Sequence, residues 1–295
     1  MTATINLTAV SPSSIGNHAT CPLRLVLDSQ CPRPEDSRYE PQRNFGKVMH
    51  WCSQQRLGAP PRDVPSFDAV QSAQRCQEAK AAGDFSRHTD VVTGLAADLV
   101  REQSPGVRSW VSEVSSYNLS LMPTRLGRKG ELKGFGGSID LLDVDRTHLW
   151  DFKFVGIDKM PEPPLNPTDD PKISNEYLWQ IASYHILEKV RFCGIIWVSR
   201  CGKKSSFLKL DFAKPRNQEL AQRVLRFIDF VQYKNFPDLA WPCRGPNCQW
   251  CHHKGVTCPA WDVPYATLGH LRTGVQKHTA LAAALAARKP ATPIL

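Results

Sequence analysis

The feature that most constrains the fold is the stretch from Gly134 to Lys153. Two apolar runs, Ser138–Val144 and His148–Val155, flank a polar turn at residues 145–147. Short runs of β-forming residues around a tight polar turn are typical of a β-hairpin. This stretch therefore predicts two neighbouring antiparallel strands.

The predicted hairpin carries three charged side chains. Asp140 lies in the first run, and Asp151 and Lys153 lie two apart in the second. Because side chains alternate across a strand, Asp151 and Lys153 share one face and Phe152 points to the other. The neighbouring strand can bring Asp140 alongside them. Two acids and a lysine on one face suit a divalent cation and an activated water. The alternative is a solvated face with an Asp–Lys pair, but the apolar opposite face predicts that the second strand is internal.

Composition limits the class of protein. The chain has 295 residues, enough for one large domain or a domain with an appendage. Lys and Arg number 37 against 28 Asp and Glu, and the resulting net charge of +9 favours a polyanionic partner such as nucleic acid. No apolar run is long enough to cross a membrane, and the N-terminus lacks the features of a signal peptide. We therefore expect a cytoplasmic, reducing environment, in which the 10 cysteines are thiols or metal ligands.

The order of predicted elements indicates an α/β fold. Residues 1–44 are expected to be loop-like. The helix expected over 88–102 has Val91, Val92, Leu95, Ala96 and Leu99 on its apolar face. In chain order, the remaining expected segments are helices over 44–56 and 66–82, a strand over 110–121, a basic linker over 125–133, the hairpin, a Pro-rich loop over 160–171, a helix over 173–190, strands over 193–200 and 206–212, a helix over 218–233, and a helix over 265–288. Strands and helices in this order predict a mixed sheet with helices on its faces. No Walker-type phosphate loop is present, which argues against an NTPase.

Four short motifs in one order give this chain a family resemblance. Gly46-Lys-Val-Met-His50, Gly137-Ser-Ile-Asp140, Asp151-Phe-Lys153 and Gln180-Ile-Ala-Ser-Tyr184 follow one another along the sequence. Together they resemble the RecB-like branch of the PD-(D/E)XK nucleases. The usual Pro before the first acid is absent, and a Gly stands three residues before that acid instead. The resemblance implies a restriction-endonuclease-like mixed β-sheet core flanked by helices.

The resemblance also implies a metal site. Asp140 and Asp151 would hold Mg²⁺ or Mn²⁺, and the carbonyl of Phe152 would complete the protein's ligands. An imidazole ligand at His50 would tilt the preference towards Mn²⁺. A histidine on a helix is otherwise more often an ordinary core or surface residue.

Three further side chains receive roles from the same resemblance. Lys153 would orient the water and stabilise developing charge. Gln180 and Tyr184 are four apart on one helix face and would line the site or support Lys153. Glu113, on the preceding strand, would be a further acid near the metal, and a solvated strand residue is the alternative reading of it.

A compact cysteine cluster follows the predicted core. Cys248-Gln-Trp-Cys251 and Cys258 have metal-ligand spacing and need a fourth ligand. Cys243 would complete a local zinc knuckle. The other candidates for the fourth ligand are His252, His253, Cys21 and Cys31.

The resemblance favours iron over zinc. Iron–sulfur members of this nuclease group, of the AddB and CRISPR-associated adaptation types, carry one cysteine before the core and three after it. That pattern assigns Cys21, Cys248, Cys251 and Cys258 to a [4Fe–4S] cluster that joins the N- and C-terminal segments. The implied domains are a segment over 1–44, a nuclease core over 45–240, and the cysteine cluster and helix over 241–295.

These expectations combine into one function. The chain is expected to be a metal-dependent DNA exonuclease in recombination, repair or end processing, acting on single strands or duplex ends, alone or with a helicase or recombination partner. Its size and resemblance suit a bacterial or phage-infected cell. The alternatives are a non-catalytic nucleic-acid-binding or assembly protein with the same fold and a zinc-knuckle endonuclease.

Overall fold

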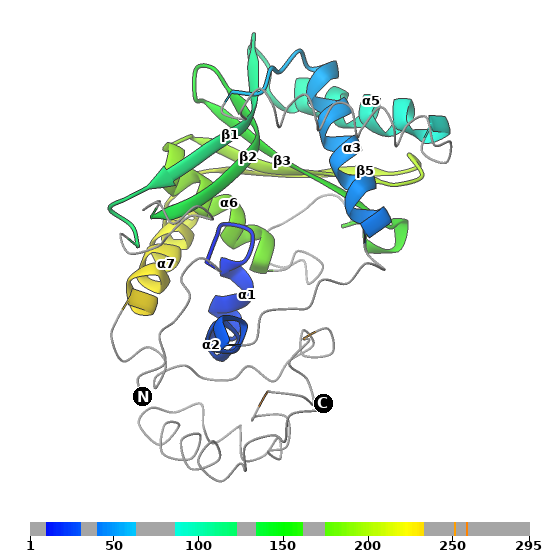
Figure 1. Cartoon of the computed structure of the whole chain (residues 1–295). Helices are drawn as coiled ribbons and strands as arrows, with labels where there is room; N and C mark the ends of the chain where they lie inside the picture. The colour runs from blue at the N-terminus through cyan, green and yellow to red at the C-terminus, as the bar shows by residue number, and fades with distance from the viewer. Residues whose placement is uncertain are drawn as a thin grey trace, which may run out of the picture.

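A computed structural model of the chain describes residues 10–30, 40–62, 86–122, 134–161 and 175–232, together with Cys251 and Cys258. Helices and strands follow one another in the order shown in Figure 1. The elements are α1 (Ile15–Thr20), α2 (Pro22–Gln30), α3 (Glu40–Arg56), α5 (Ser86–Gln103), β1 (Trp110–Asn118), β2 (Phe135–Asp143), β3 (His148–Val155), a 3₁₀ turn (Ile157–Lys159), α6 (Asn175–Glu188), β4 (Phe192–Ser199), β5 (Ser205–Asp211) and α7 (Pro215–Gln232).

The strands form one five-stranded mixed sheet in the order β1-β2-β3-β4-β5. All neighbours are antiparallel except β3 and β4, which are parallel. A parallel pair needs a crossover connection, and α6 provides it between these two strands. The predicted hairpin is therefore confirmed as β2 and β3, and β3 is the central strand, as its apolar face predicts.

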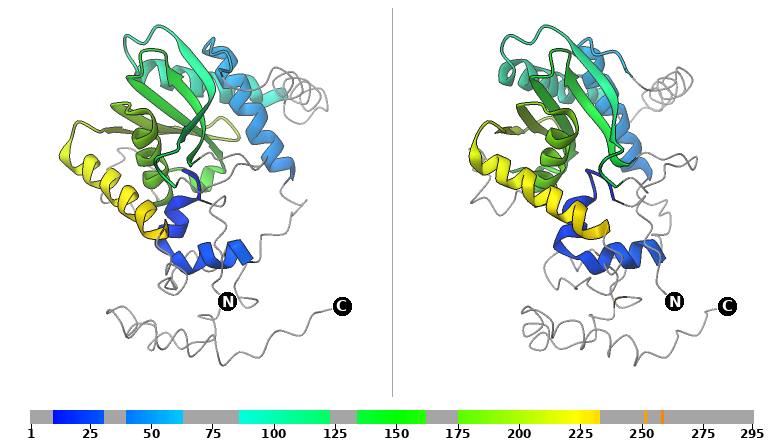
Figure 2. Two further views of the ribbon diagram at one scale, coloured as in Figure 1. Left: turned by 60° about the vertical axis from the view of Figure 1, so that its left-hand side comes forward. Right: turned by 90° about the vertical axis from the view of Figure 1, so that its left-hand side faces the viewer.

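Helices cover both faces of the sheet (Figures 1 and 2). On one face, residues of α1, α2, α6 and α7 pack with the sheet around buried side chains such as Ile181 and Trp197. On the other face, α3 and α5 pack around Trp150 and Phe152. These two apolar layers enclose β3, so any polar side chain on this strand lies in a largely dehydrated setting.

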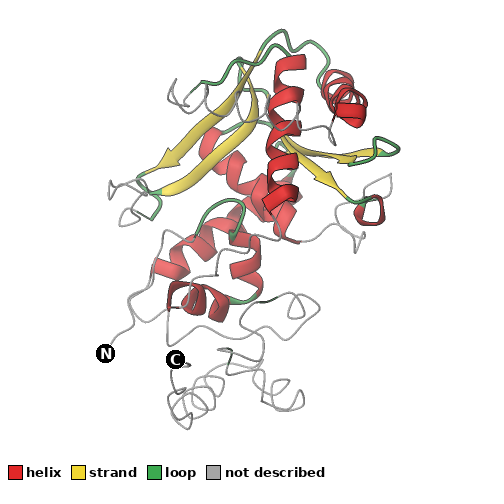
Figure 3. Cartoon of the chain, turned by 45° about the vertical axis from the view of Figure 1, so that its right-hand side comes forward, coloured by secondary structure: helices red, strands yellow, loops and turns green. Residues whose placement is uncertain are grey.

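The N-terminal segment differs from the loop expected over 1–44. It contains α1 and α2, which lie on the same face as α6 (Figure 3). Pro22 occupies the first position of α2, where a missing N–H costs nothing, and Leu23, Val26 and Leu27 follow at helical spacing and are buried. That spacing is the signal that identifies this helix.

The remaining expected elements agree with the structure except in detail. Helices α3, α5, α6 and α7 and strands β1, β4 and β5 occupy the expected places within a few residues. Val91 does not belong to the buried face of α5, because it is 52% exposed while Val92 is fully buried. The helices expected over 66–82 and 265–288 and the basic linker over 125–133 lie outside the described residues. In the part of the chain that is described, no helix combines the length and apolar character needed to cross a membrane.

Candidate active site

The site is built where β2 and β3 separate. These strands pair only at Leu141 with Trp150 and at Leu142 with Leu149, next to their turn. Asp140 and Asp151 are the next residue on each strand beyond the last pair. In place of a further ladder bond, the Phe152 N–H donates to Asp140 Oδ2 at 2.8 Å. We call this point, where β2 and β3 separate after Leu141 and Trp150, the fork. It brings the two predicted acids to opposite sides of one opening in the sheet.

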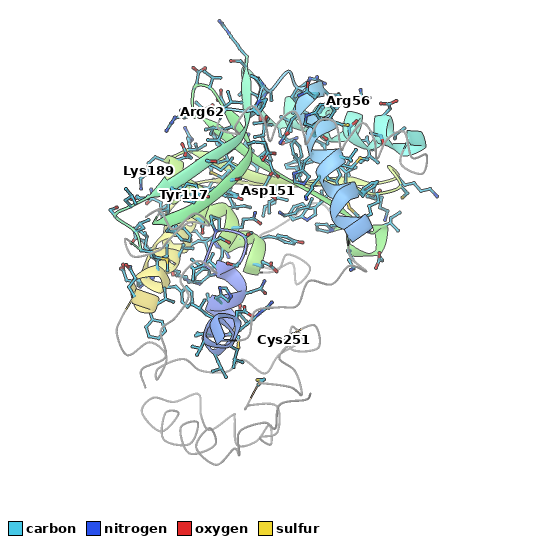
Figure 4. All side chains as sticks on the ribbon, in the orientation of Figure 1. Arg56, Arg62, Tyr117, Asp151, Lys189 and Cys251 are labelled. Atoms are coloured by element: carbon cyan, nitrogen blue, oxygen red, sulfur yellow. The ribbon has the colours of Figure 1, made fainter. Side chains whose placement is uncertain are left out.

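Asp151 is the most enclosed of the site's charged groups. Its side chain is 3% exposed and lies within the body of the molecule (Figure 4). Its Oδ2 lies 2.6 Å from Lys153 Nζ in an ion pair. Gln180 Nε2 donates to the other oxygen, Oδ1, at 2.8 Å. Asp151 and Lys153 thus lie on the same face of β3, as the alternation of side chains along a strand predicts.

Helix α6 connects the two sides of the fork by hydrogen bonds. Besides Asp151, the Gln180 amide reaches the Tyr184 hydroxyl at 3.0 Å. That hydroxyl donates to the Ser138 carbonyl on β2, also at 3.0 Å. All three bonds are buried or partly buried, which makes them strong in their local environment. Gln180 and Tyr184 therefore fix α6 against both acid-bearing strands.

Helix α3 adds an imidazole from the opposite face of the sheet. His50 Nδ1 lies 3.1 Å from Asp140 Oδ2. The ring also meets Phe152 and Phe154 edge-on, with centroid separations of 5.9 and 5.4 Å. The aromatic side chains of β3 thereby orient His50 towards Asp140.

The electrostatics of the site separate its two aspartates. Burial raises the pKa of Asp151 to about 6, and the charge of Asp140 adds to this, although Lys153 opposes it. Burial also pushes the pKa of Asp140 upward, but the neighbouring His50 and Lys153 and the Phe152 N–H outweigh it and hold that pKa below its usual value. The Asp140 charge in turn raises the pKa of His50 in spite of burial. Desolvation pushes the pKa of Lys153 downward, but Asp151 and Asp140 outweigh it and raise that pKa, so the side chain stays an ammonium.

The donors at the fork have the chemistry of a divalent-cation site. Two carboxylates and one imidazole suit Mg²⁺ or Mn²⁺. Among the described residues, no three His, Cys, Asp or Glu side chains are gathered closely enough to form a metal shell. Instead, Lys153 neutralises Asp151 and His50 neutralises Asp140. The residues fit a cation, and its entry would replace these internal ion pairs.

Sequence reasoning missed one polar residue at this site. Gln54, one turn after His50 on α3, is 2% exposed and donates to Glu113 Oε1 at 2.8 Å and to the Asp140 carbonyl at 2.9 Å. Its spacing of four from His50 is the only signal in the sequence. Glu113 lies near Asp140, and its pKa is raised first by burial and then by the Asp140 charge.

Three of the four predicted cluster cysteines are described. Cys21 follows α1, where its N–H donates to the Asn17 carbonyl. Cys21 and Cys258, although far apart in the sequence, both pack against the apolar layer that contains α6. Cys251 is half-buried and lies at the end of the molecule where α1 and α2 lie (Figure 4). Cys248 and the alternative ligand Cys243 lie outside the described residues.

Comparison with known proteins supplies a family. The family model of the PD-(D/E)XK nuclease superfamily matches residues 9–259. Among solved structures, the crystal structure of SSO0001 is similar at 12% identity, covering 78% of this chain and 99% of that chain with a TM-score of 0.34. An alkaline exonuclease from Laribacter hongkongensis is similar at 14% identity, covering 77% of this chain and 93% of that chain with a TM-score of 0.26. No curated protein sequence matches. Because the family model spans most of the chain, including the fork and its acids, this protein belongs to the PD-(D/E)XK nuclease superfamily.

Proposed function

We propose that this chain is a metal-dependent DNA exonuclease that hydrolyses phosphodiester bonds in recombination, repair or end processing. The observation that carries the proposal is the set formed by the buried Asp151 and the partly buried Asp140 and Lys153 at the β2–β3 fork, with Gln180 hydrogen-bonded to Asp151. Placing acids and an ammonium in a dehydrated interior is costly, so such a set indicates a functional site more than a structural one. Membership of a nuclease superfamily supplies the reaction class.

Asp140 and Asp151, with His50 and the Phe152 carbonyl, are the groups that would hold Mg²⁺ or Mn²⁺. The cation would polarise the phosphate and lower the pKa of a bound water. Lys153 is the ammonium placed to orient that water and to stabilise the negative charge that develops on the phosphate. Gln180 holds the Asp151 carboxylate through Oδ1, and Lys153 pairs with Oδ2.

DNA is the proposed polyanionic partner. The net charge of +9 favours attraction to phosphates, which makes binding salt-dependent. A helicase or recombination partner would supply opened ends, and without one the chain would act on existing ends.

Four thiols, those of Cys21, Cys248, Cys251 and Cys258, would hold a [4Fe–4S] cluster. The packing of Cys21 and Cys258 against one apolar layer supports a link between the two ends of the chain. The cluster would join the segment over 1–44 to the segment over 241–295 across a nuclease core over 45–240. Zinc bound with Cys243 is the alternative.

The nuclease proposal is tested with end-labelled linear DNA, single- and double-stranded, and with closed circles. With Mn²⁺ or Mg²⁺, we expect the wild-type chain to degrade the linear forms and spare the circles. Asp151→Ala should be inactive, and Gln55→Ala, at an exposed position on α3, should match the wild type. Equal behaviour of wild type and Asp151→Ala would contradict nuclease function, and cleavage of circles would identify an endonuclease.

A further inference from the structure

Strand β1 is distorted at one residue beside the site. Glu113 has a φ of 49°, in the left-handed region that non-glycine residues seldom adopt. The register pairs Ser112 with Leu141 and Val114 with Ile139, so Glu113 stands directly opposite Asp140. The strained residue and the first acid of the fork therefore face each other on neighbouring strands.

Both strands change faces at this point. Side chains two or four apart on a strand should share a face. Trp110 nevertheless packs in the α3–α5 layer and Val114 in the α6 layer. On β2, Leu141 and Ile139 divide between the two layers in the same way. The reversal on both strands centres on the Glu113–Asp140 position.

The segment after α3 holds β1 immediately before the distortion. The Ser112 N–H donates to the Pro60 carbonyl at 2.9 Å, and the Arg62 N–H donates to the Ser112 carbonyl at the same distance. The Ser112 hydroxyl also donates to the Ala59 carbonyl at 3.0 Å. Ser112 is thus held by residues 59–62, which follow α3, and the distortion of β1 comes at the next residue, Glu113.

Gln54 completes this arrangement from α3 itself. Its buried amide donates one hydrogen bond to the Glu113 carboxylate and one to the Asp140 backbone carbonyl. A strained backbone persists only where its surroundings hold it, and Gln54 binds both residues of the distorted pair. Among the contacts of the described residues, the hydrogen bond from Gln54 is the one that directs the Glu113 carboxylate towards Asp140.

We propose that Gln54 is a positioning residue that holds Glu113 beside Asp140 as the third acid of the cation site. It acts through Glu113, and it sets how tightly a divalent cation is held. This inference rests on the proposed function for the reaction served, but cation binding can be measured without cleavage.

The test measures Mn²⁺ binding to the full chain by calorimetry and by electron paramagnetic resonance. Gln54→Met fills similar space without donors and should weaken Mn²⁺ binding about tenfold, as loss of supporting hydrogen bonds does in metal sites. Glu113→Gln should weaken it similarly, and the double variant should be little worse than either single one. Gln55→Ala, the exposed neighbour on α3, should bind as the wild type does.

Cleavage assays separate positioning from a general structural role. Gln54→Met should need more Mn²⁺ for half-maximal rate but approach the wild-type rate at saturation, with cooperative unfolding retained. Unaltered Mn²⁺ affinity, fully additive effects, or a Gln54→Met chain that does not fold would each overturn the inference. A wild type that binds Mn²⁺ with this pattern but cuts no DNA would overturn only the nuclease proposal.

Discussion

At Asp151, the requirements of folding and of chemistry conflict. Burial in β3 raises the pKa of this carboxyl to about 6 in spite of the adjacent Lys153. Keeping the carboxylate charged at neutral pH therefore costs stability in the metal-free protein. Asp151→Asn keeps the shape and removes that charge. We expect the variant to lose cleavage by about a hundredfold or more, since one dehydrated polar group is often worth that much in rate. The substitution also removes the partner of the Lys153 ammonium, so the melting temperatures of the metal-free forms are compared across pH rather than at one pH.

The pH dependence of this difference has a definite sign. A folded-state pKa that lies above the unfolded value of 3.8 means that the native state binds the proton more tightly. Wild-type stability should then fall relative to Asp151→Asn as the pH rises from about 4 through 6. Thermal unfolding in chelator at pH 4, 5, 6 and 7 measures the gap. A gap that is constant with pH would contradict the raised pKa.

The polar partners of Asp140 show where residue-level prediction stops. Asp140, Asp151 and Lys153 were identifiable because local alternation and motif order place them. Gln54 on α3 bonds Glu113 at the point where β1 takes a left-handed residue in mid-strand. No sequence pattern encodes a positive φ at a glutamate, so this contact required the structure.

At the scale of elements, β3 and β4 depend on a glycine for their close packing. Trp150 on β3 pairs with Gly194 on β4. A Cβ on Gly194 would lie 2.3 Å from the Trp150 ring and 2.4 Å from the Leu208 carbonyl on β5. The Trp150 ring is itself held by a buried 2.8 Å hydrogen bond from its Nε1 to Ser104, so it cannot easily yield. We expect Gly194→Ala to destabilise the fold by about 1–3 kcal/mol in urea unfolding, as overpacked cores do.

Two helical glycines serve as controls for that prediction. Among the described residues, a Cβ on Gly46 of α3 or on Gly94 of α5 would meet nothing within 4 Å. Replacing a helical glycine by alanine removes chain entropy from the unfolded state and favours the helix. Gly46→Ala and Gly94→Ala should therefore each stabilise the fold by up to about 1 kcal/mol. Destabilisation by either substitution would contradict this.

An ion pair ties the start of β4 to the end of β5. Arg191 Nε and an Nη lie 3.0 and 3.1 Å from the two Asp211 oxygens, and the Ala213 N–H also donates to this carboxylate. The hydrogen bond from Arg191, with the one from Ala213, lowers the Asp211 pKa to about 2. Because the folded pKa is depressed, the stabilisation is present above the unfolded value near 4 and is lost as the pH falls through 2.

Asp211→Asn should therefore lower the melting temperature at pH 7 and lose that deficit on acidification. Differential scanning calorimetry between pH 7 and pH 2 follows the difference. Asp229→Asn, at an exposed position on α7, is the control and should change stability little at any pH. A deficit for Asp211→Asn that persists at pH 2 would show that the ion pair is not its cause.

Element prediction succeeded where the pattern was long or strictly alternating. The hairpin, the internal position of β3 and helices α3, α5, α6 and α7 were predicted from the pattern of apolar and polar residues. Helices α1 and α2 were missed because each is short and Cys21-Pro22 interrupts the apolar spacing between them. Helix α1 also packs against α6, and local sequence does not encode that contact.

At the scale of the whole molecule, the N-terminal helices connect the predicted cluster to the fork. Helix α1 packs on α6, the helix that carries Gln180 and Tyr184, and Cys21 follows α1 directly. A buried His18 on α1 lies 3.0 Å from Asp28 on α2, so the two helices form one corner around Cys21. Whatever holds Cys21 therefore also supports α6 behind the acids.

The proposed [4Fe–4S] cluster makes this support depend on the far end of the chain. A link between Cys21 and the cysteines at 248, 251 and 258 closes a loop around almost the whole core, and longer closed loops restrict the unfolded state more. After anaerobic purification, Cys21→Ala should lose iron and visible absorbance, while Cys243→Ala should keep both. Cys21→Ala should also unfold at a lower temperature. The expected loss in the free energy of unfolding is about 2–4 kcal/mol, as for other long-range cross-links. Protein that is colourless, contains zinc and loses it on Cys243→Ala would show instead that a local zinc knuckle closes the C-terminal segment. Helix α1 would then be held by its contacts with α6 and α2.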